Sequence, residues 1–169
     1  MRLVNGLRFI PALVWMTVIY WLSDKPAPES SMESEGLAMR IVKLITENSG
    51  LSEADQMERA LYLEPYIRDV AHVLEYAILA VFIYIAVKVF VSDFRKAVIW
   101  TVVICFLYSC TDEWHQYHVP GRAAQVVDIV LDTSGAVIAL LVLAAKQILN
   151  KRRAAEGGID EDNRQKEIA

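Results

Sequence analysis

Apolar residues are concentrated in four blocks along the chain, and polar residues occupy the stretches between them. The blocks cover residues 7–22, 70–91, 97–110 and 126–145. A bilayer core about 30 Å thick requires about 20 helical residues. The second and fourth blocks reach this length alone, the first when extended back to Leu3, and the third when its helix continues to Gln116. This pattern predicts an all-α membrane protein, a bundle of four transmembrane helices. The predicted spans cover residues 3–22, 68–91, 97–116 and 126–145.

Two shorter segments between the first and second blocks have apolar residues at helical spacing. The first runs from about Met32 to Asn48 and precedes Gly50, a residue suited to a left-handed C-cap. Ser52 is placed to cap the start of the second segment, and Pro65 is expected to end it. We expect both amphipathic helices to lie on the bilayer surface or over the mouth of the bundle. They could form a lid over a site or only a packing cap.

The distribution of charge predicts the topology. Lysine and arginine gather at the N-terminus, around the second loop and just after the fourth block, where acidic residues are scarce. The positive-inside rule places these three regions in the cytoplasm, so that both termini are cytoplasmic and loop 23–67 is extracytoplasmic. Residues 1–150 are expected to form one membrane domain. The polar residues 151–169 are expected to form a disordered cytoplasmic tail.

Composition agrees with a membrane protein and excludes other classes. The 169 residues are 55% hydrophobic with a mean hydropathy of +0.32, above the usual range of soluble domains. Cys105 and Cys110 lie on one predicted helix and indicate neither a disulfide framework nor a zinc site. Gly135 and Ala139 are spaced as small residues at a helix–helix contact. No basic, aromatic-rich surface indicates nucleic-acid binding.

Ionisable and amide side chains lie near the outer ends of three predicted spans. They are Arg68, His72, Glu75, Asp112, Glu113, His115, Gln116, Asp128 and Asp132. A charge at membrane depth costs about 2.5 kcal/mol or more, so these carboxylates are expected to face each other, arginine, histidine, water or a ligand. His72 and Glu75 share one helix face, and Asp128 and Asp132 share another. The pattern predicts a polar site beneath the outer leaflet.

Structural roles are alternatives for several of these residues. Asp128 could cap its helix and complement the helix dipole, and Glu75 could pair with Arg122 as a structural bridge. Pro120 and Gly121 are typical turn residues. A rigid turn would hold the Arg122 guanidinium over the site, where it could bind a phosphate or carboxylate.

Two stretches of the chain resemble the VanZ-like family. RDVAHVLEYAILA, residues 68–80, resembles a family motif at His72 and Tyr76. TDEWHQYHVPGRAAQVVDIVLDTSGA, residues 111–136, resembles the signature D-E-x-H-Q…P-G-R…D…G. The matching positions are Asp112, Glu113, His115, Gln116, Pro120, Gly121, Arg122, Asp128 and Gly135. Ser23 in WLSDKP also resembles the serine at the end of the family's first span.

Three positions depart from the family pattern. Lys25 stands where the family usually has glutamine, Gln125 where a small hydroxyl residue is common, and Asp132 where asparagine is frequent. The resemblance implies a bacterial cytoplasmic-membrane protein. The family's namesake is associated with low-level resistance to teicoplanin, a glycopeptide that acts on cell-wall precursors outside this membrane. That is the side on which the charge distribution places the polar site.

Three functional hypotheses follow. An enzyme would act by hydrolysis or group transfer on a membrane lipid or lipid-linked wall precursor, with acid/base groups or a possible divalent metal. Its expected catalytic residues are His72, Glu75, Asp112, Glu113, His115 and Asp128. Its expected substrate-binding residues are Arg68, Gln116, Arg122, Asp132 and Ser23. The alternatives are a non-catalytic protein that binds or transports a lipid or antibiotic, and a polar network that only clamps the bundle.

Overall fold

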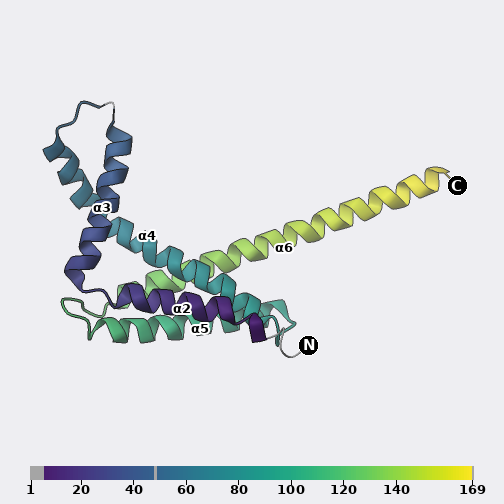
Figure 1. Ribbon diagram of the computed structural model, residues 1–169. Coiled ribbons are helices and arrows are strands. Elements are labelled where there is room, and N and C mark those ends of the chain that lie inside the picture. Colours follow the sequence, from purple (N-terminus) through teal and green to yellow (C-terminus); the bar gives the residue numbers. More distant parts are fainter. Residues whose placement is uncertain (1–5, 48, 169) are drawn as a thin grey trace.

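The computed structural model describes the backbone of residues 6–47 and 49–168, and side chains as far as residue 154. These residues form helices and connecting turns without a strand (Figure 1). The helices are α2 (Ile10–Ser23), α3 (Ala27–Thr46), α4 (Glu53–Val87), α5 (Phe94–Gln116) and α6 (Val126–Ile168). The all-helical prediction is confirmed. Of the described helices, α4, α5 and α6 are long and apolar enough to cross a membrane.

The first apolar block forms a shorter helix than the sequence predicts. Helix α2 has 14 residues and begins at Ile10, whereas the predicted span begins near residue 3, in a part that lies outside the described residues. At about 1.5 Å per residue α2 is about 21 Å long, less than the bilayer core. Pro11 lacks the amide hydrogen that would continue the helix backward, and Arg8 and Phe9 form a turn.

The loop before the second span forms a helical hairpin that projects from one end of the bundle (Figure 1). Helix α3 starts at Ala27, earlier than expected, and Gly50 adopts a positive φ of 67° after it. The Ser52 Oγ atom accepts a hydrogen bond from the Asp55 amide at 3.2 Å, which confirms the predicted cap.

The prediction that Pro65 ends this second amphipathic helix is wrong. Pro65 lies inside α4, which continues without interruption from Glu53 into the second apolar block. Proline removes one backbone hydrogen bond, to the carbonyl of Leu61, but the many bonds on either side keep a 35-residue helix continuous. As a result, one helix joins the hairpin rigidly to the bundle.

Helices α5 and α6 meet at the end of the bundle nearest the hairpin. Helix α5 continues to Gln116, as the shortness of the third apolar block predicts, and α6 begins at Val126. Helix α6 continues through residues 151–168 in the described backbone, and the disorder of this tail stays a prediction. Its cytoplasmic location stays a prediction.

The helices pack closely around a small apolar core. Gly135 of α6 lies so close to α4 that an added Cβ atom would be 2.1 Å from the Val73 carbonyl oxygen, so the predicted packing role is confirmed. The Trp15 indole donates to the Glu75 carbonyl at 2.8 Å, and the Tyr108 hydroxyl donates to the Met16 carbonyl at 2.6 Å. These two bonds fasten α2 to α4 and α5.

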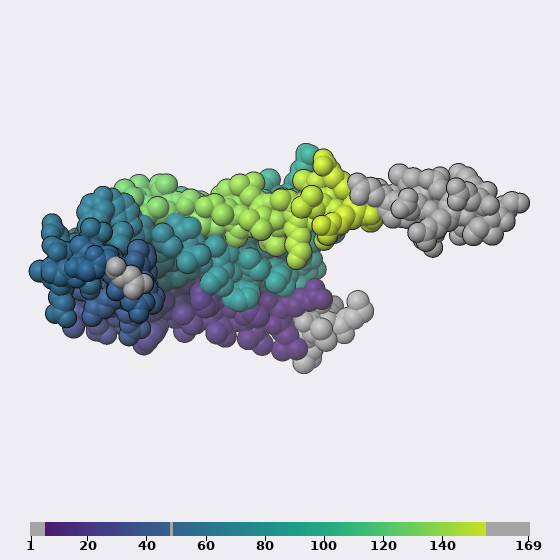
Figure 2. All heavy atoms as spheres, turned by 90° about the horizontal axis from the view of Figure 1, so that it is seen from above, coloured from purple at the N-terminus to yellow at the C-terminus, as the bar shows by residue number. Residues whose placement is uncertain are grey.

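The outer surface of the bundle is apolar. The view of Figure 2 shows α2, α4 and α6 running side by side as an elongated body, with the hairpin at one end. Leu13, Trp100, Leu107, Val130 and Leu141 are all more than half exposed. Apolar side chains exposed all around a helical bundle are typical of a surface that faces lipid.

Candidate functional site

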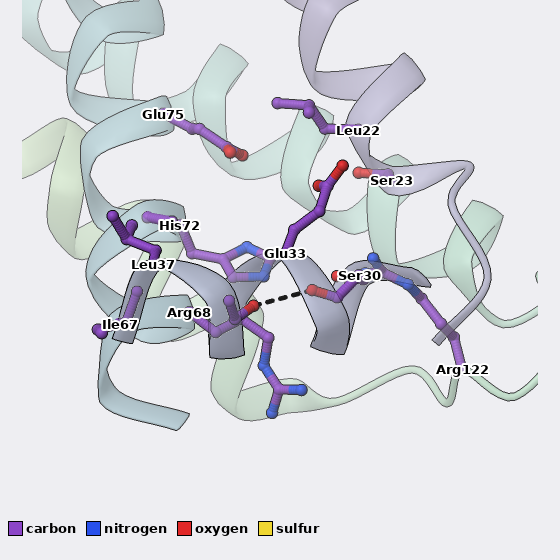
Figure 3. Close-up of a pocket in the computed structure, with 12 residues that line it drawn as sticks. Leu22, Ser23, Ser30, Glu33, Leu37, Ile67, Arg68, His72, Glu75 and Arg122 are labelled. Atoms are coloured by element: carbon purple, nitrogen blue, oxygen red, sulfur yellow. Dashed lines mark hydrogen bonds between the residues drawn. The ribbon is translucent and has the colours of Figure 1, made fainter. Parts of the chain in front are cut away.

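Two adjoining cavities lie where the hairpin meets the bundle. The first, about 200 Å³, is bounded by the end of α2, the start of α3 and the middle of α4. The second, about 170 Å³, is bounded by α3, α4, the start of α6 and the turn between α5 and α6. Four residues line both cavities: Ser30, Arg68, His72 and Arg122. Figure 3 shows three successive turns of α4 carrying Arg68, His72 and Glu75 along the first cavity.

The Arg122 guanidinium is fixed in place by neutral acceptors. Its Nε atom donates to the Lys25 carbonyl at 3.0 Å, and its Nη1 atom donates to Gln116 Oε1 at 3.0 Å. Burial, and the positive charge of Arg68, lower its pKa. Among the described side chains neither arginine forms an ion pair with a carboxylate. The site therefore holds two guanidiniums whose charge is not neutralised by a direct partner.

The turn that carries Arg122 forms as the sequence predicts. The Arg122 amide donates to the Val119 carbonyl at 3.1 Å, and Gly121 has a positive φ of 78°, the geometry of a proline–glycine turn. The Ala27 amide also donates to the Pro120 carbonyl at 3.2 Å. This bond anchors the turn to the first residue of α3 and brings Arg122 to the cavities.

His72 is bonded to a buried carboxylate. Its Nδ1 atom lies 3.2 Å from Asp132 Oδ1, and the Ser109 hydroxyl donates to Asp132 Oδ2 at 2.7 Å. Asp132 is 0% exposed. It lies behind the His72 imidazole and lines neither cavity. Its side chain is therefore not placed for the direct contact with substrate that the sequence predicts.

A second polar chain connects α5 to the end of α2. The Gln116 amide nitrogen donates to Asp112 Oδ2 at 3.1 Å and lies 3.4 Å from the Ser23 hydroxyl. Ser23 lines the first cavity and Gln116 the second, while Asp112 is buried behind them. Because the side-chain oxygen Oε1 of Gln116 accepts a hydrogen bond from Arg122, this chain holds the guanidinium in position.

Glu113 supports the start of α6. Its Oε2 atom accepts a hydrogen bond from the Gln125 amide at 2.7 Å. A carboxylate at a helix N-terminus complements the positive end of the helix dipole. Glu113 is buried and is not among the cavity-lining residues, so its contacts are those of a structural group.

Glu75, Asp128 and Glu33 are the carboxylates that line the cavities. Glu75 and Glu33 line the first cavity and Asp128 the second. In the described part of the chain, Asp128 makes no side-chain hydrogen bond to its helix terminus, and Glu75 makes no ion pair with Arg122. Glu33 instead pairs with Lys25 at 2.6 Å. Glu75 and Asp128 are therefore left facing the cavities.

His115 points away from the other candidates. Its ring stacks on Tyr20, with 4.4 Å between ring centroids, and its Nε2 atom lies 3.2 Å from the Asp24 carboxylate. The residue therefore contacts the C-terminal end of α2. Like Asp112, Glu113 and Asp132, His115 lines neither of the two cavities.

The described residues contain no group of three or more histidine, cysteine, aspartate or glutamate side chains placed to hold a metal ion. Of the expected catalytic residues, three instead make separate hydrogen bonds: His72 to Asp132, Asp112 to Gln116, and Glu113 to the Gln125 amide. No metal site is built on these residues.

Sequence reasoning missed part of the site. Ser30, Glu33 and Ser34 on α3 line the first cavity. The prediction for this helix rests only on its apolar face and does not include these polar residues. The polar face, ESSMES, was the available signal. Ser109 was also missed, although it lies one helical turn before Asp112 on the same buried face of α5.

Comparison with known protein families identifies a match. A family model described as VanZ/LLP1 matches residues 9–149, which contain α2 to α5 and most of the apolar part of α6. No curated protein and no solved structure matches the chain. The matched range contains every candidate site residue.

Proposed function

We propose a function from one established premise: this chain belongs to the VanZ/LLP1 family. In this proposal, the protein binds the phosphate-bearing headgroup of a membrane lipid or lipid-linked cell-envelope precursor. The observation that carries the proposal is the pair of guanidiniums, Arg68 and Arg122, that line both cavities without a carboxylate partner among the described residues. Arginine presents planar, bidentate donors that suit phosphate.

The arrangement of the helices supports a site at the membrane surface. The cavities lie at the end of the bundle, beside a hairpin with exposed apolar residues, including Leu44 and Ile45. A lipid could place its chains along the apolar outer surface while its headgroup enters between α3 and α4. We propose that α2 is a fourth span, that both termini are cytoplasmic, and that the cavities open to the outer leaflet of a bacterial cytoplasmic membrane, as the charge distribution predicts.

This location bears on the resistance that the family resemblance implies. Teicoplanin acts on cell-wall precursors outside the cytoplasmic membrane, and the proposed site would contact lipids of the outer leaflet. We propose that binding or processing such a lipid underlies low-level teicoplanin resistance. The test compares the teicoplanin susceptibility of cells that express the wild-type chain with that of cells that express the Arg68→Gln variant. Equal susceptibility would refute the link between lipid binding and resistance.

Binding itself is tested on the full chain purified in detergent. Phosphatidic acid is expected to raise the Tm of the wild type by preferential binding to the folded state, whereas phosphatidylcholine is expected to do so less. Loss of one charge-assisted contact of about 1.5–3 kcal/mol should weaken the affinity of Arg68→Gln and Arg122→Gln by about 10-fold or more.

Arg95→Gln is the matched control for these variants. Arg95 is exposed in the first turn of α5, at the opposite end of that helix from the site. The control should bind as the wild type does. Equal losses in all three variants would indicate a non-specific charge effect and would refute the headgroup site.

A structural clamp is the second candidate, because one observation favours it. The bonds around Asp132 tie α4, α5 and α6 together in the interior of the bundle. A clamp alone predicts that Arg68→Gln leaves lipid binding unchanged, because Arg68 takes no part in those bonds. The same binding measurement therefore separates the two candidates.

A further inference from the structure

His72 is presented to the cavities in a fixed orientation. Both Asp132 oxygens act as acceptors, one from the Ser109 hydroxyl at 2.7 Å and one toward His72 Nδ1 at 3.2 Å. When the imidazole is neutral and Nδ1 donates to Asp132, the hydrogen is on Nδ1 and the lone pair of the ring is on Nε2. Nε2 makes no hydrogen bond within the described part of the chain, and His72 lines both cavities.

The residues beside this nitrogen suit a phosphoryl group. The residues common to both cavities are two arginines, one serine and His72 itself. Guanidiniums and a hydroxyl can hold the oxygens of a phosphate, and an imidazole nitrogen with a free lone pair can attack phosphorus. Figure 3 shows His72 in the middle of this group, between Arg68 and Glu75 on α4, with Ser30 and Arg122 on the other side of the cavity.

We propose that His72 is the nucleophile of a lipid diphosphate phosphatase and that Asp132 is its positioning residue. This inference rests on the proposed function, because it requires the cavities to bind a lipid phosphate. It adds a reaction, a nucleophile and a substrate class to that binding site. It also gives Asp132 a role other than contact with substrate.

The reaction proceeds in two balanced steps. In the first, the Nε2 lone pair forms a bond to the terminal phosphorus, and the bond from that phosphorus to the bridging oxygen breaks. The electron pair leaves on the lipid monophosphate. The hydrogen stays on Nδ1 and is donated in a hydrogen bond to Asp132, whose carboxylate stabilises the positive ring. In the second, water attacks the phosphohistidine, a proton passes to the Asp128 carboxylate, and inorganic phosphate leaves with Nε2 restored.

A diphosphate is the substrate class that this site accommodates best. Its leaving group is a phosphate, which departs as an anion without needing a proton. An alkyl phosphate would release an alkoxide and require a general acid at the leaving oxygen. Asp128, the carboxylate assigned to the water step, lines the second cavity, and His72 lines both cavities.

The test uses the full chain in detergent micelles with farnesyl diphosphate as the probe. Release of inorganic phosphate measures turnover, and the shift in Tm on adding the probe measures binding independently. Terminally ³²P-labelled probe should label the protein with the stability of phosphohistidine, labile in acid and stable in alkali. Peptide mapping should place the label on His72.

Three variants distinguish nucleophile, positioning residue and background. His72→Gln should abolish both phosphate release and labelling. Asp132→Asn should lower kcat by at least about 100-fold with little change in KM, because it disturbs the tautomer and not the phosphate ligands. His118→Gln should match the wild type, since that ring lies on the exposed turn and contacts the Trp114 carbonyl.

The outcomes separate this inference from the proposed function. A probe that binds but is neither hydrolysed nor a source of label would overturn the phosphatase and leave the binding site standing. A probe that does not bind would overturn the phosphatase alone if phosphatidic acid still raises the Tm, and would overturn both proposals if phosphatidic acid also fails to bind. Turnover that survives in His72→Gln, or a label on another residue, would overturn the role of His72. Farnesyl monophosphate hydrolysed faster than the diphosphate would overturn the substrate class.

Discussion

Replacing Gly135 with alanine should destabilise the bundle at the contact between α4 and α6. The new Cβ atom would lie 2.1 Å from the Val73 carbonyl oxygen and 2.9 Å from the carbonyl carbon. An ordinary carbon–oxygen contact is about 3.3 Å, so the helices must separate by about 1 Å. The clashing atoms belong to helix backbone, which cannot rotate away as the end of a long side chain would.

The expected magnitude has two parts. Overpacking of a close contact costs about 1–3 kcal/mol. The shift also acts on Asp132, which lies one helical turn before Gly135 and contacts His72 at 3.2 Å. A separation of the helices by about 1 Å would lengthen this buried hydrogen bond and weaken it. A hydrogen bond to a charged group contributes about 1.5–3 kcal/mol. We therefore expect a loss of about 2–5 kcal/mol in the free energy of unfolding.

The assay is thermal unfolding of the full chain in one detergent, with Gly36→Ala as the matched control. Nothing lies within 4 Å of a Cβ atom added at Gly36, which is inside α3. Alanine should stabilise that helix by up to about 1 kcal/mol. If Gly135→Ala unfolds at the wild-type temperature, or if both variants lose stability equally, the close approach of α4 and α6 is refuted.

Three further predictions concern the hairpin, the turn and the topology. Pro65→Ala should stabilise α4 by up to about 3 kcal/mol, visible as a higher Tm, because it restores a helix hydrogen bond; a lower Tm would contradict a continuous helix. Gly121→Ala should destabilise the protein by about 1 kcal/mol or more, because φ is 78° and its Cβ would lie 3.2 Å from Ala27 Cβ; an unchanged Tm would contradict this turn geometry. A cysteine at His118 should react with a membrane-impermeant reagent from outside the cell and a cysteine at Ser92 should not; the reverse pattern would overturn the topology.

The sequence predicts much of the local structure correctly because the signals are local. The cap at Ser52, the positive φ at Gly50 and the turn at Gly121 each depend on residues within a few positions. The extension of α5 to Gln116 follows from the length that a span requires. The signals fail at Pro65, where the many helix bonds on both sides outweigh one lost bond.

The candidate site was predicted in outline but not in its contacts. Helical spacing places Asp112 and Gln116 on one face of α5, and the structure buries both together with Ser109. His115 lies off that face and turns to Tyr20, a choice that depends on where α2 packs. The serines of α3 join the site because the hairpin folds back on α4, and no spacing within the sequence fixes that contact.

The sequence by itself determined that this is a helical membrane protein of one family, with polar groups at the ends of its apolar helices. Periodicity, length and motif spacing are properties of the chain alone, and they carry this information. The tertiary structure decided which polar groups meet. Asp132 bonds His72 across 60 positions of sequence, and Arg122 reaches the Lys25 carbonyl across 97. Such pairings depend on how whole helices dock, because a buried polar group takes whichever partner packing brings within reach.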